Sequence, residues 1–246
     1  MRLGFVAGPV FAHAPTPFVA LLARQLGLPV GEVVRHFRSA RRGDVTAHLR
    51  RQRAEFRASG QIGFAPGATL YALVRTLRPA FVVETGVSSG VSSAFILAAI
   101  RDNGAGTLVS IDLPFTERDG EPASILPGTS IDKAQWSPIP PGESSGWLVP
   151  DALRDRWRLR LGDAAELLPQ TLEEVGEIGL FLHDSLHTLD HMLFEFETAW
   201  PHIAPGGILA SDDLDQGDGR PLRVFSERVH RRFFAVAGVA FMRKPG

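Results

Sequence analysis

One strand–loop–helix unit constrains the fold of this chain more than any other feature. The apolar run Phe81-Val82-Val83 ends in Glu84, passes through a loop of glycines and serines, and continues into an apolar helix from Ala94 to Ile100. Such a loop exposes backbone N–H groups at a helix N-terminus. Gly86 and Gly90 would let a ligand approach the backbone closely, and Glu84 offers a carboxylate where a ribose hydroxyl could lie. The unit therefore predicts a site for a nucleoside-like cofactor.

The spacing of the loop glycines argues against two common nucleotide sites. Dinucleotide-binding loops follow G-x-G-x-x-G, and phosphate-binding loops follow G-x-x-x-x-G-K-[ST]. Here Gly86 and Gly90 form G-x-x-x-G, with no third glycine and no lysine in the loop. A purely structural interpretation stays open, in which the two glycines only permit tight packing of the strand against the helix.

The alternation of strands and helices from Ala80 onward predicts the architecture. The expected strands span 80–85, 107–112, 157–161, 178–184 and 207–211, and the expected helices span 90–102, 164–168, 187–200 and 221–232. Residues 233–242 predict one or two closing strands around Gly238, in antiparallel orientation. This order predicts an α/β fold, a Rossmann-like three-layer sandwich with a mostly parallel, seven-stranded sheet.

We interpret residues 1–246 as one domain with two additions to this core. Residues 1–77 predict an N-terminal helical cap, and residues 78–246 predict the Rossmann-like core. Within the core, residues 113–150 form a long connection with seven prolines. Long connections of this kind often act as lids or binding loops. Because this one leaves the carboxyl end of a strand, we expect a lid over the ligand site, with a neutral insertion as the alternative.

Composition limits the classes of partner. The net charge is −1, 44% of residues are hydrophobic, there is no cysteine, and no apolar run approaches the ~20 residues that span a bilayer. Eight arginines lie between Arg35 and Arg57, but lysine occurs only at Lys133 and Lys244, so a preference for arginine explains the cluster. We therefore expect a cytoplasmic protein that binds neither nucleic acid nor membrane.

Acidic residues follow several of the predicted strands. Asp112 ends the second strand, where a carboxylate could accept both hydroxyls of a cofactor ribose or simply cap the next loop. Asp163 follows the third strand and begins a short helix, so it predicts an N-cap. It could also accept the exocyclic amine of adenine while Ala164 donates its N–H to the ring.

The most specific group of candidate site residues follows the fourth and fifth strands. Asp184 ends the fourth strand, His187 follows three residues later, and Asp212 and Asp213 end the fifth. Ends of neighbouring parallel strands lie together, so the three carboxylates could converge on a cation. Ligands that are all oxygen suit Mg²⁺, Ca²⁺ or Mn²⁺. Instead of binding a metal, the acids could lie in a solvated turn. His187 could likewise be an exposed residue at the N-terminus of a helix.

Taken in order, these motifs resemble the class I S-adenosylmethionine-dependent methyltransferases over about residues 70–242. The Pro205-Gly206-Gly207 turn before the fifth strand is typical of that superfamily. The resemblance implies that S-adenosylmethionine is the cofactor. The cofactor-binding residues that we predict are Glu84, Thr85, Gly86, Ser88, Gly90, Ser92, Asp112, Leu113, Asp163, Ala164 and Asp184.

Within the superfamily the chain is most similar to metal-dependent O-methyltransferases of macrolides and other sugar-bearing natural products. The resemblance implies that Asp184, Asp212 and Asp213 hold Mg²⁺ and that His187 is the catalytic base. Asp212 stands where those enzymes have glutamate, one methylene longer, which weakens the match. Catechol-type enzymes place lysine at the position of His187 and asparagine at that of Asp213, so they fit less well.

The sequence favours an O-methyltransferase that acts on a hydroxyl of a small molecule, with magnesium assistance. The alternatives are a metal-independent methyltransferase of the same fold, a non-catalytic cofactor-binding scaffold, and a nicotinamide oxidoreductase, which the missing G-x-G-x-x-G disfavours. The acceptor cannot be read from the sequence, and homo-oligomerisation stays open.

Overall fold

The computed structural model describes residues 16–55, 62–118, 121–126, 139–212 and 220–246. The helices are α1 (Thr16–Gln25), α2 (Val30–Arg42), α3 (Asp44–Glu55), α4 (Phe64–Leu77), α5 (Val91–Asn103), α6 (Ala164–Val175), α7 (Leu189–Ala199) and α8 (Arg220–Arg228), with short 3₁₀ turns η1 (Asp151–Arg156) and η2 (Trp200–His202). The strands are β1 (Phe81–Thr85), β2 (Thr107–Asp112), β3 (Phe115–Arg118), β4 (Glu121–Ser124), β5 (Trp157–Leu161), β6 (Ile178–His183), β7 (Ile203–Ser211), β8 (Phe233–Val236) and β9 (Val239–Arg243).

Seven of these strands form one sheet in the order β5-β2-β1-β6-β7-β9-β8. The five strands from β5 to β7 are parallel, whereas β9 pairs antiparallel with both β7 and β8. The sheet confirms the predicted mostly parallel, seven-stranded architecture. Its order reverses between β1 and β6, and in open α/β sheets ligands bind beside such a reversal, at the carboxyl ends of the strands.

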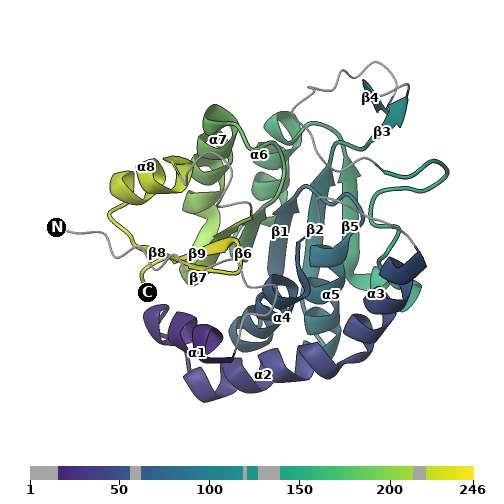
Figure 1. The fold of residues 1–246 in the computed structure, drawn as a ribbon. Coiled ribbons are helices and arrows are strands. Elements are labelled where there is room, and N and C mark those ends of the chain that lie inside the picture. The colour runs from purple at the N-terminus through teal and green to yellow at the C-terminus, as the bar shows by residue number, and fades with distance from the viewer. Residues whose placement is uncertain (1–15, 56–61, 119–120, 127–138, 213–219) are drawn as a thin grey trace.

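Alternating residues of each strand enter two separate apolar cores, because successive side chains of a strand point to opposite faces. Val82, Leu108 and Leu180 pack on one face with residues of α1 to α5, and Val83 and Phe181 pack on the other with residues of α6, α7 and α8. Figure 1 shows the central sheet between these helical layers. The three-layer arrangement leaves the carboxyl edge of the strands to loops.

Helix α8 ends at Arg228, whereas we expected it to continue to residue 232, and three further local features differ from expectation. Helix α6 continues to Val175 through Pro169, where we expected it to end at residue 168, because Thr171 and Leu172 are buried against the sheet. Strand β7 begins before the Pro-Gly-Gly turn rather than after it. The turn interrupts its pairing, so that Ile178 pairs with Ile203 and Leu180 with Ile208.

The third difference lies in the long connection 113–150. Strands β3 and β4 form an antiparallel hairpin there, visible beyond the top of the sheet in Figure 1. The sequence analysis predicted no strand in this connection. Residues 119–120 and 127–138 of the connection lie outside the described residues.

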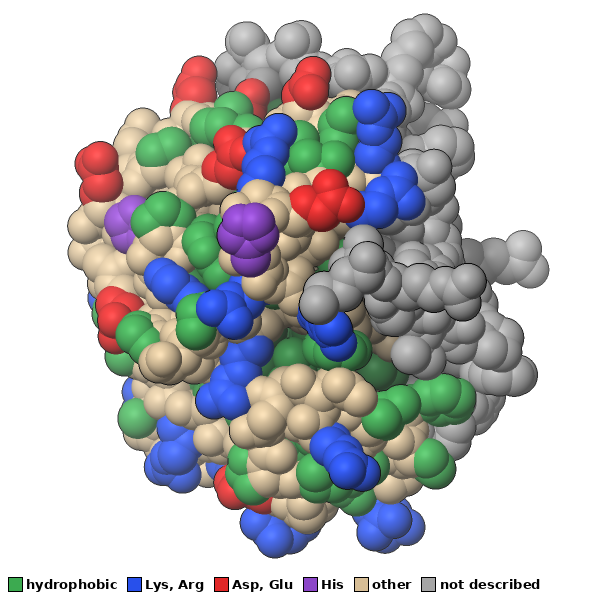
Figure 2. Space-filling view, turned by 90° about the vertical axis from the view of Figure 1, so that its left-hand side faces the viewer, with side chains coloured by type: hydrophobic (Ala, Val, Ile, Leu, Met, Phe, Trp, Pro, Cys, Tyr) green, Lys and Arg blue, Asp and Glu red, His purple; other side chains and the backbone are tan. Residues whose placement is uncertain are grey.

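The N-terminal helices pack against the core. Helix α4 is almost wholly apolar and buried, and Arg101 of α5 binds the carboxylate of Asp44 in α3 with its shortest N···O distance at 2.7 Å. On the face shown in Figure 2, basic, acidic and apolar side chains are intermixed. Among the helices that the structure describes, none combines the length and the apolar character needed to cross a bilayer.

Candidate active site

The glycine loop after β1 lies against the end of β6. Gly86 has a φ of +81°, and a Cβ atom added there would lie 1.9 Å from the carbonyl oxygen of Asp184. The N–H of Asp184 donates to the carbonyl oxygen of Thr85 at 2.8 Å. Gly90 has a φ of +85° and begins α5. The two glycines therefore permit close packing of the loop on Asp184 and on Gly146, which differs from the packing of strand against helix in the structural interpretation, and this does not test cofactor binding.

The carboxylate of Glu84 points into the protein. It is fully buried and accepts hydroxyl hydrogen bonds from Ser92 at 2.5 Å, Ser93 at 2.6 Å and Ser110 at 2.8 Å. Burial raises the pKa of Glu84, and the three hydroxyls counteract part of that rise. Glu84 thus anchors the first turn of α5 to the sheet, and contact with a ribose hydroxyl stays a prediction for it.

Asp112 lies at the end of β2, directly beside the glycine loop. One carboxylate oxygen, Oδ1, accepts the backbone N–H of Val87 at 2.8 Å and that of Ser88 at 3.4 Å. Asp112 is 7% exposed, and burial raises its pKa while these hydrogen bonds oppose the rise. The structure therefore places a buried carboxylate at the carboxyl edge of the sheet, next to the reversal of strand order.

Residues 139–150, which we call the strap, cross over the glycine loop. Gly146 donates its N–H to the carbonyl oxygen of Ser88 at 2.7 Å, and Leu148 donates to that of Ser89 at 3.0 Å. The Ser145 hydroxyl donates to Oδ2 of Asp112 at 2.5 Å. The described end of the predicted lid is thus docked on the predicted cofactor loop.

Asp163 caps α6, as its position predicted. It is exposed, and its Oδ1 accepts the N–H of Ala165 at 2.8 Å. Ala164 is buried at the first helical position, and Leu113 is half-buried directly after Asp112. These three residues lie at the ends of β2 and β5, which are neighbours in the sheet. Contacts with adenine stay predictions for them.

Two of the three predicted metal ligands, Asp184 and Asp212, lie at the ends of adjacent strands. Asp184 follows β6, and Asp212 follows β7 and donates its N–H to the carbonyl oxygen of His183 at 2.9 Å. Asp213 lies outside the described residues. Within the described ranges, no three His, Asp or Glu side chains group as a metal site would require. The described residues therefore do not fit a metal on their own, and we derive no catalytic step through one.

His187 lies in the turn between β6 and α7. Its ring contacts that of His183 edge-on, with 5.1 Å between the ring centroids. Burial, and secondarily the nearby His183, lower the pKa of His187 to about 3. His187 is therefore a neutral imidazole at physiological pH, able to accept a hydrogen bond from a hydroxyl group. A general base works best when its pKa is near the working pH, so burial makes His187 a weak one.

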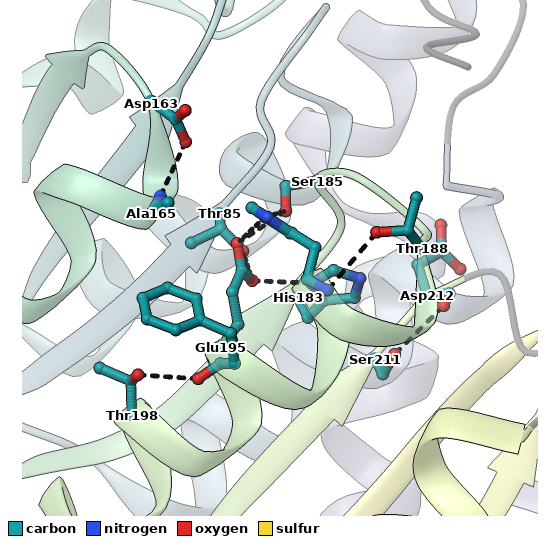
Figure 3. A network of polar contacts seen from close by, with 12 residues as sticks. Thr85, Asp163, Ala165, His183, Ser185, Thr188, Glu195, Thr198, Ser211 and Asp212 are labelled. Carbon is teal, nitrogen blue, oxygen red and sulfur yellow. Dashed lines mark hydrogen bonds and ion pairs between the residues drawn. The ribbon is translucent and has the colours of Figure 1, made fainter. Parts of the chain in front are cut away.

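Beneath this turn lies a buried carboxylate with four hydrogen-bond partners. Oε2 of Glu195 accepts from Thr85 at 2.5 Å and contacts Nδ1 of His183 at 2.7 Å. Its Oε1 accepts from Ser185 at 2.7 Å and contacts Nε2 of His191 at 2.9 Å. Figure 3 shows Thr85 of β1, His183 of β6 and Ser185 of the turn that follows β6 converging on Glu195 of α7.

The groups in this network shift one another's pKa values. Burial alone would raise the pKa of Glu195, but His183 and the hydrogen bonds lower it below its usual range. Burial alone would lower the pKa of His191, but Glu195 raises it. The network therefore holds an ionised carboxylate inside the protein and joins the end of β1 to the turn that carries Asp184 and His187.

Sequence reasoning missed Glu195 and Ser145 and left His183 unassigned. A signal for Glu195 exists, because α7 buries Met192, Phe196 and Ala199, and an acid at position 195 falls on the same face. His191 is half-buried, and its Nε2 contacts Oε1 of Glu195. No local pattern marks Ser145, whose partner Asp112 lies 33 positions earlier.

The fold and the carboxyl-edge site together define a class of protein. A seven-stranded sheet in this order, with an acid at the end of β2 beside a glycine loop, is the architecture of class I S-adenosylmethionine-dependent methyltransferases. Residues 83–214 match a family model described as a methyltransferase domain. Because the match covers more than half of the chain, the chain belongs to this family of methyltransferases.

Solved structures show the same fold at low sequence identity. PaMTH1 from Podospora anserina, bound to S-adenosylhomocysteine, is 18% identical over 83% of this chain and 89% of its own, with a TM-score of 0.55. The O-methyltransferase TomG from Streptomyces achromogenes, in complex with S-adenosylmethionine, is 17% identical over 83% and 91%, with a TM-score of 0.56. CalS11, a TDP-rhamnose 3'-O-methyltransferase, is 19% identical over 94% and 95%, with a TM-score of 0.52. No curated protein sequence matches the chain.

Proposed function

We propose that the protein transfers a methyl group from S-adenosylmethionine to a hydroxyl of a small molecule. The observation that carries the proposal is Asp112, a buried carboxylate held beside the glycine loop at the carboxyl edge of the sheet. A carboxylate there suits a ribose diol, because it accepts two hydrogen bonds. Cofactor-bound relatives of the same fold support the choice of cofactor.

Methyl transfer requires mainly that the protein position the acceptor oxygen and the methyl group. The acceptor oxygen attacks the sulfonium methyl carbon in line, the C–S bond breaks, its electron pair stays on sulfur, and the hydroxyl proton leaves. Holding the two reactants in that geometry supplies much of the acceleration. His187, neutral because of its lowered pKa of about 3, would accept a hydrogen bond from the acceptor hydroxyl and orient it. The proton would then pass on to solvent, since so weak a base does not retain it near neutral pH.

The cofactor site can be tested without knowing the acceptor. We expect calorimetric titration with S-adenosylhomocysteine to show micromolar binding, and we expect Asp112→Ala to abolish it, because the ribose loses its acceptor. Asp151→Ala is a suitable control, because Asp151 is exposed in η1 and pairs only at the surface with Arg154. Equal binding by the wild type and Asp112→Ala would contradict the role of Asp112.

A sugar or a related natural product is the acceptor class we propose. CalS11, whose fold this chain shares along nearly its whole length, methylates a nucleotide-linked rhamnose. We propose that the N-terminal region, residues 1–77, and the connection 113–150 shape the acceptor pocket of a single domain. The proposal retains a small hydroxylated partner and a cytoplasmic location, with no role for nucleic acid or membrane.

The magnesium requirement remains a prediction with a direct test. If Asp184, Asp212 and Asp213 together hold Mg²⁺, we expect EDTA to abolish methylation of an acceptor found by screening, and added Mg²⁺ to restore it. The measurement is the rate of S-adenosylhomocysteine formation. Full activity in EDTA would instead identify a metal-independent methyltransferase. Cofactor binding without turnover of any acceptor would favour the non-catalytic scaffold.

A further inference from the structure

The carboxylate of Asp112 has few acceptor sites left for a ribose. Its two oxygens offer about four lone-pair sites in all. The N–H groups of Val87 and Ser88 occupy Oδ1, and the hydroxyl of Ser145 occupies one of the two sites on Oδ2. A ribose diol that binds both hydroxyls to this carboxylate needs two sites, and one remains. Either the ribose binds through one hydroxyl only, or a present partner leaves.

Ser145 is the partner that can leave most easily. The other two donors are backbone groups of the glycine loop and cannot turn away without refolding the loop. The Ser145 side chain can rotate about its Cα–Cβ bond, because a serine hydroxyl has three staggered positions. Such a rotation breaks none of the backbone hydrogen bonds of the strap.

Contacts of the strap hold its backbone in place beside Asp112. Ser145 is 4% exposed, and the next residue, Gly146, is packed so closely on Trp157 that a Cβ atom there would lie 2.2 Å from the indole ring. Arg154 donates to the carbonyl oxygens of Gly146 at 2.9 Å and Val149 at 3.1 Å. These contacts hold the backbone that follows Ser145 in place, and the side chain of Ser145 is left to rotate over Asp112.

We propose that Ser145 is a latch on the cofactor site. In the protein without cofactor its hydroxyl holds Oδ2 of Asp112, and the cofactor exchanges that hydroxyl for one of its own ribose hydroxyls. One O–H donor replaces another, so the carboxylate keeps its charge and no proton is transferred. The latch concerns the same site as the proposed function and rests on it.

The latch makes cofactor binding weaker and slower than the site alone would allow, because a buried hydrogen bond to a charged group must break first. Removing the hydroxyl removes that cost. We therefore expect Ser145→Ala to bind S-adenosylhomocysteine about tenfold more tightly than the wild type, with a faster association rate. A residue that contacts the bound cofactor would show the opposite change.

The experiment compares three proteins by calorimetry: the wild type, Ser145→Ala and Ser144→Ala. Ser144 is the neighbouring serine and is exposed, so it controls for any effect of alanine in this turn. Stopped-flow tryptophan fluorescence gives the association rate, because Trp157 lies against the strap. Thermal unfolding of each variant checks that it is folded.

Tighter and faster binding by Ser145→Ala alone is the expected result. Equal binding by all three proteins, or weaker binding by Ser145→Ala, overturns the latch and leaves the proposed function in place. No binding by any of the three overturns the proposed function and the latch together. Binding by Ser145→Ala when the wild type does not bind supports the latch in its strongest form.

Discussion

Glu195→Ala is expected to lower the free energy of unfolding by about 3 kcal/mol or more. The substitution removes the acceptor shared by two imidazoles and two hydroxyl groups, of which His183 and Thr85 are fully buried and His191 and Ser185 half-buried. Glu195 is 0% exposed, so water does not replace it without opening the core. Denaturation by urea at pH 7, followed by circular dichroism, measures the loss.

Helix α7 carries its own control for this prediction. Glu197 lies two residues further on, is exposed and pairs with Arg228 at the surface. Glu197→Ala should change the free energy of unfolding by less than about 0.5 kcal/mol. A comparable loss in both variants would mean that the helix, and not the buried network, determines the effect.

The same network predicts how stability depends on pH. The pKa of Glu195 is lowered in the folded protein, so its ionised form contributes stability above the unfolded value of about 4.5. As the pH falls below that value, the unfolded chain takes up a proton that the folded protein does not. The stability advantage of the wild type over Glu195→Gln should therefore shrink below about pH 4.5. A constant difference down to pH 3 would contradict an ionised Glu195.

Gly86→Ala is expected to cost about 3 kcal/mol or more of folding stability and to weaken binding of S-adenosylhomocysteine at least tenfold. The new Cβ would lie 1.9 Å from the carbonyl oxygen and 2.4 Å from the carbonyl carbon of Asp184. These are backbone atoms at the end of β6 and cannot rotate away. The glycine loop and the turn after β6 would have to separate, which moves both from their positions around the site.

Gly104→Ala measures the cost of placing alanine at a positive φ when no atom clashes with the new Cβ. Gly104 ends α5 with a φ of +72°, close to that of Gly86, but no atom lies within 4 Å of a Cβ added there. It should lose only about 1 kcal/mol and bind S-adenosylhomocysteine as the wild type does. Equal losses in the two variants, measured by urea denaturation and calorimetry, would show that the contact with Asp184 is unimportant.

The sheet could be predicted from the sequence because the signals that mark its strands are local. The apolar segments around Val83, Val109 and Phe181 alternate between two buried faces, and an acid or a glycine marks where each strand ends. Parallel strands align their carboxyl ends, so Asp112, Asp184 and Asp212 could be assigned to one edge of the sheet before any coordinates were known. Which ligands they bind stays a prediction.

The remaining features depend on contacts between distant parts of the chain. Thr85 and Glu195 meet across 110 positions, and Ser145 and Asp112 meet across 33. Neither pair has a spacing rule, because loop lengths can vary without changing the contact. Helix α6 also exceeded its predicted end, since burial of Leu172 outweighs the cost of Pro169 inside the helix.

The four donors around Glu195 also restrict how this protein can evolve. They come from the end of β1, the end of β6, the turn that follows it and α7, so each is held by a different backbone segment. A substitution at any one of these positions leaves the buried carboxylate short of a donor, and an apolar replacement becomes tolerable only when several positions change together. If the N-terminal helices and the strap shape the acceptor pocket as proposed, new acceptor specificity is more accessible there, at positions other than Ser145, because single substitutions do not disturb a shared buried charge.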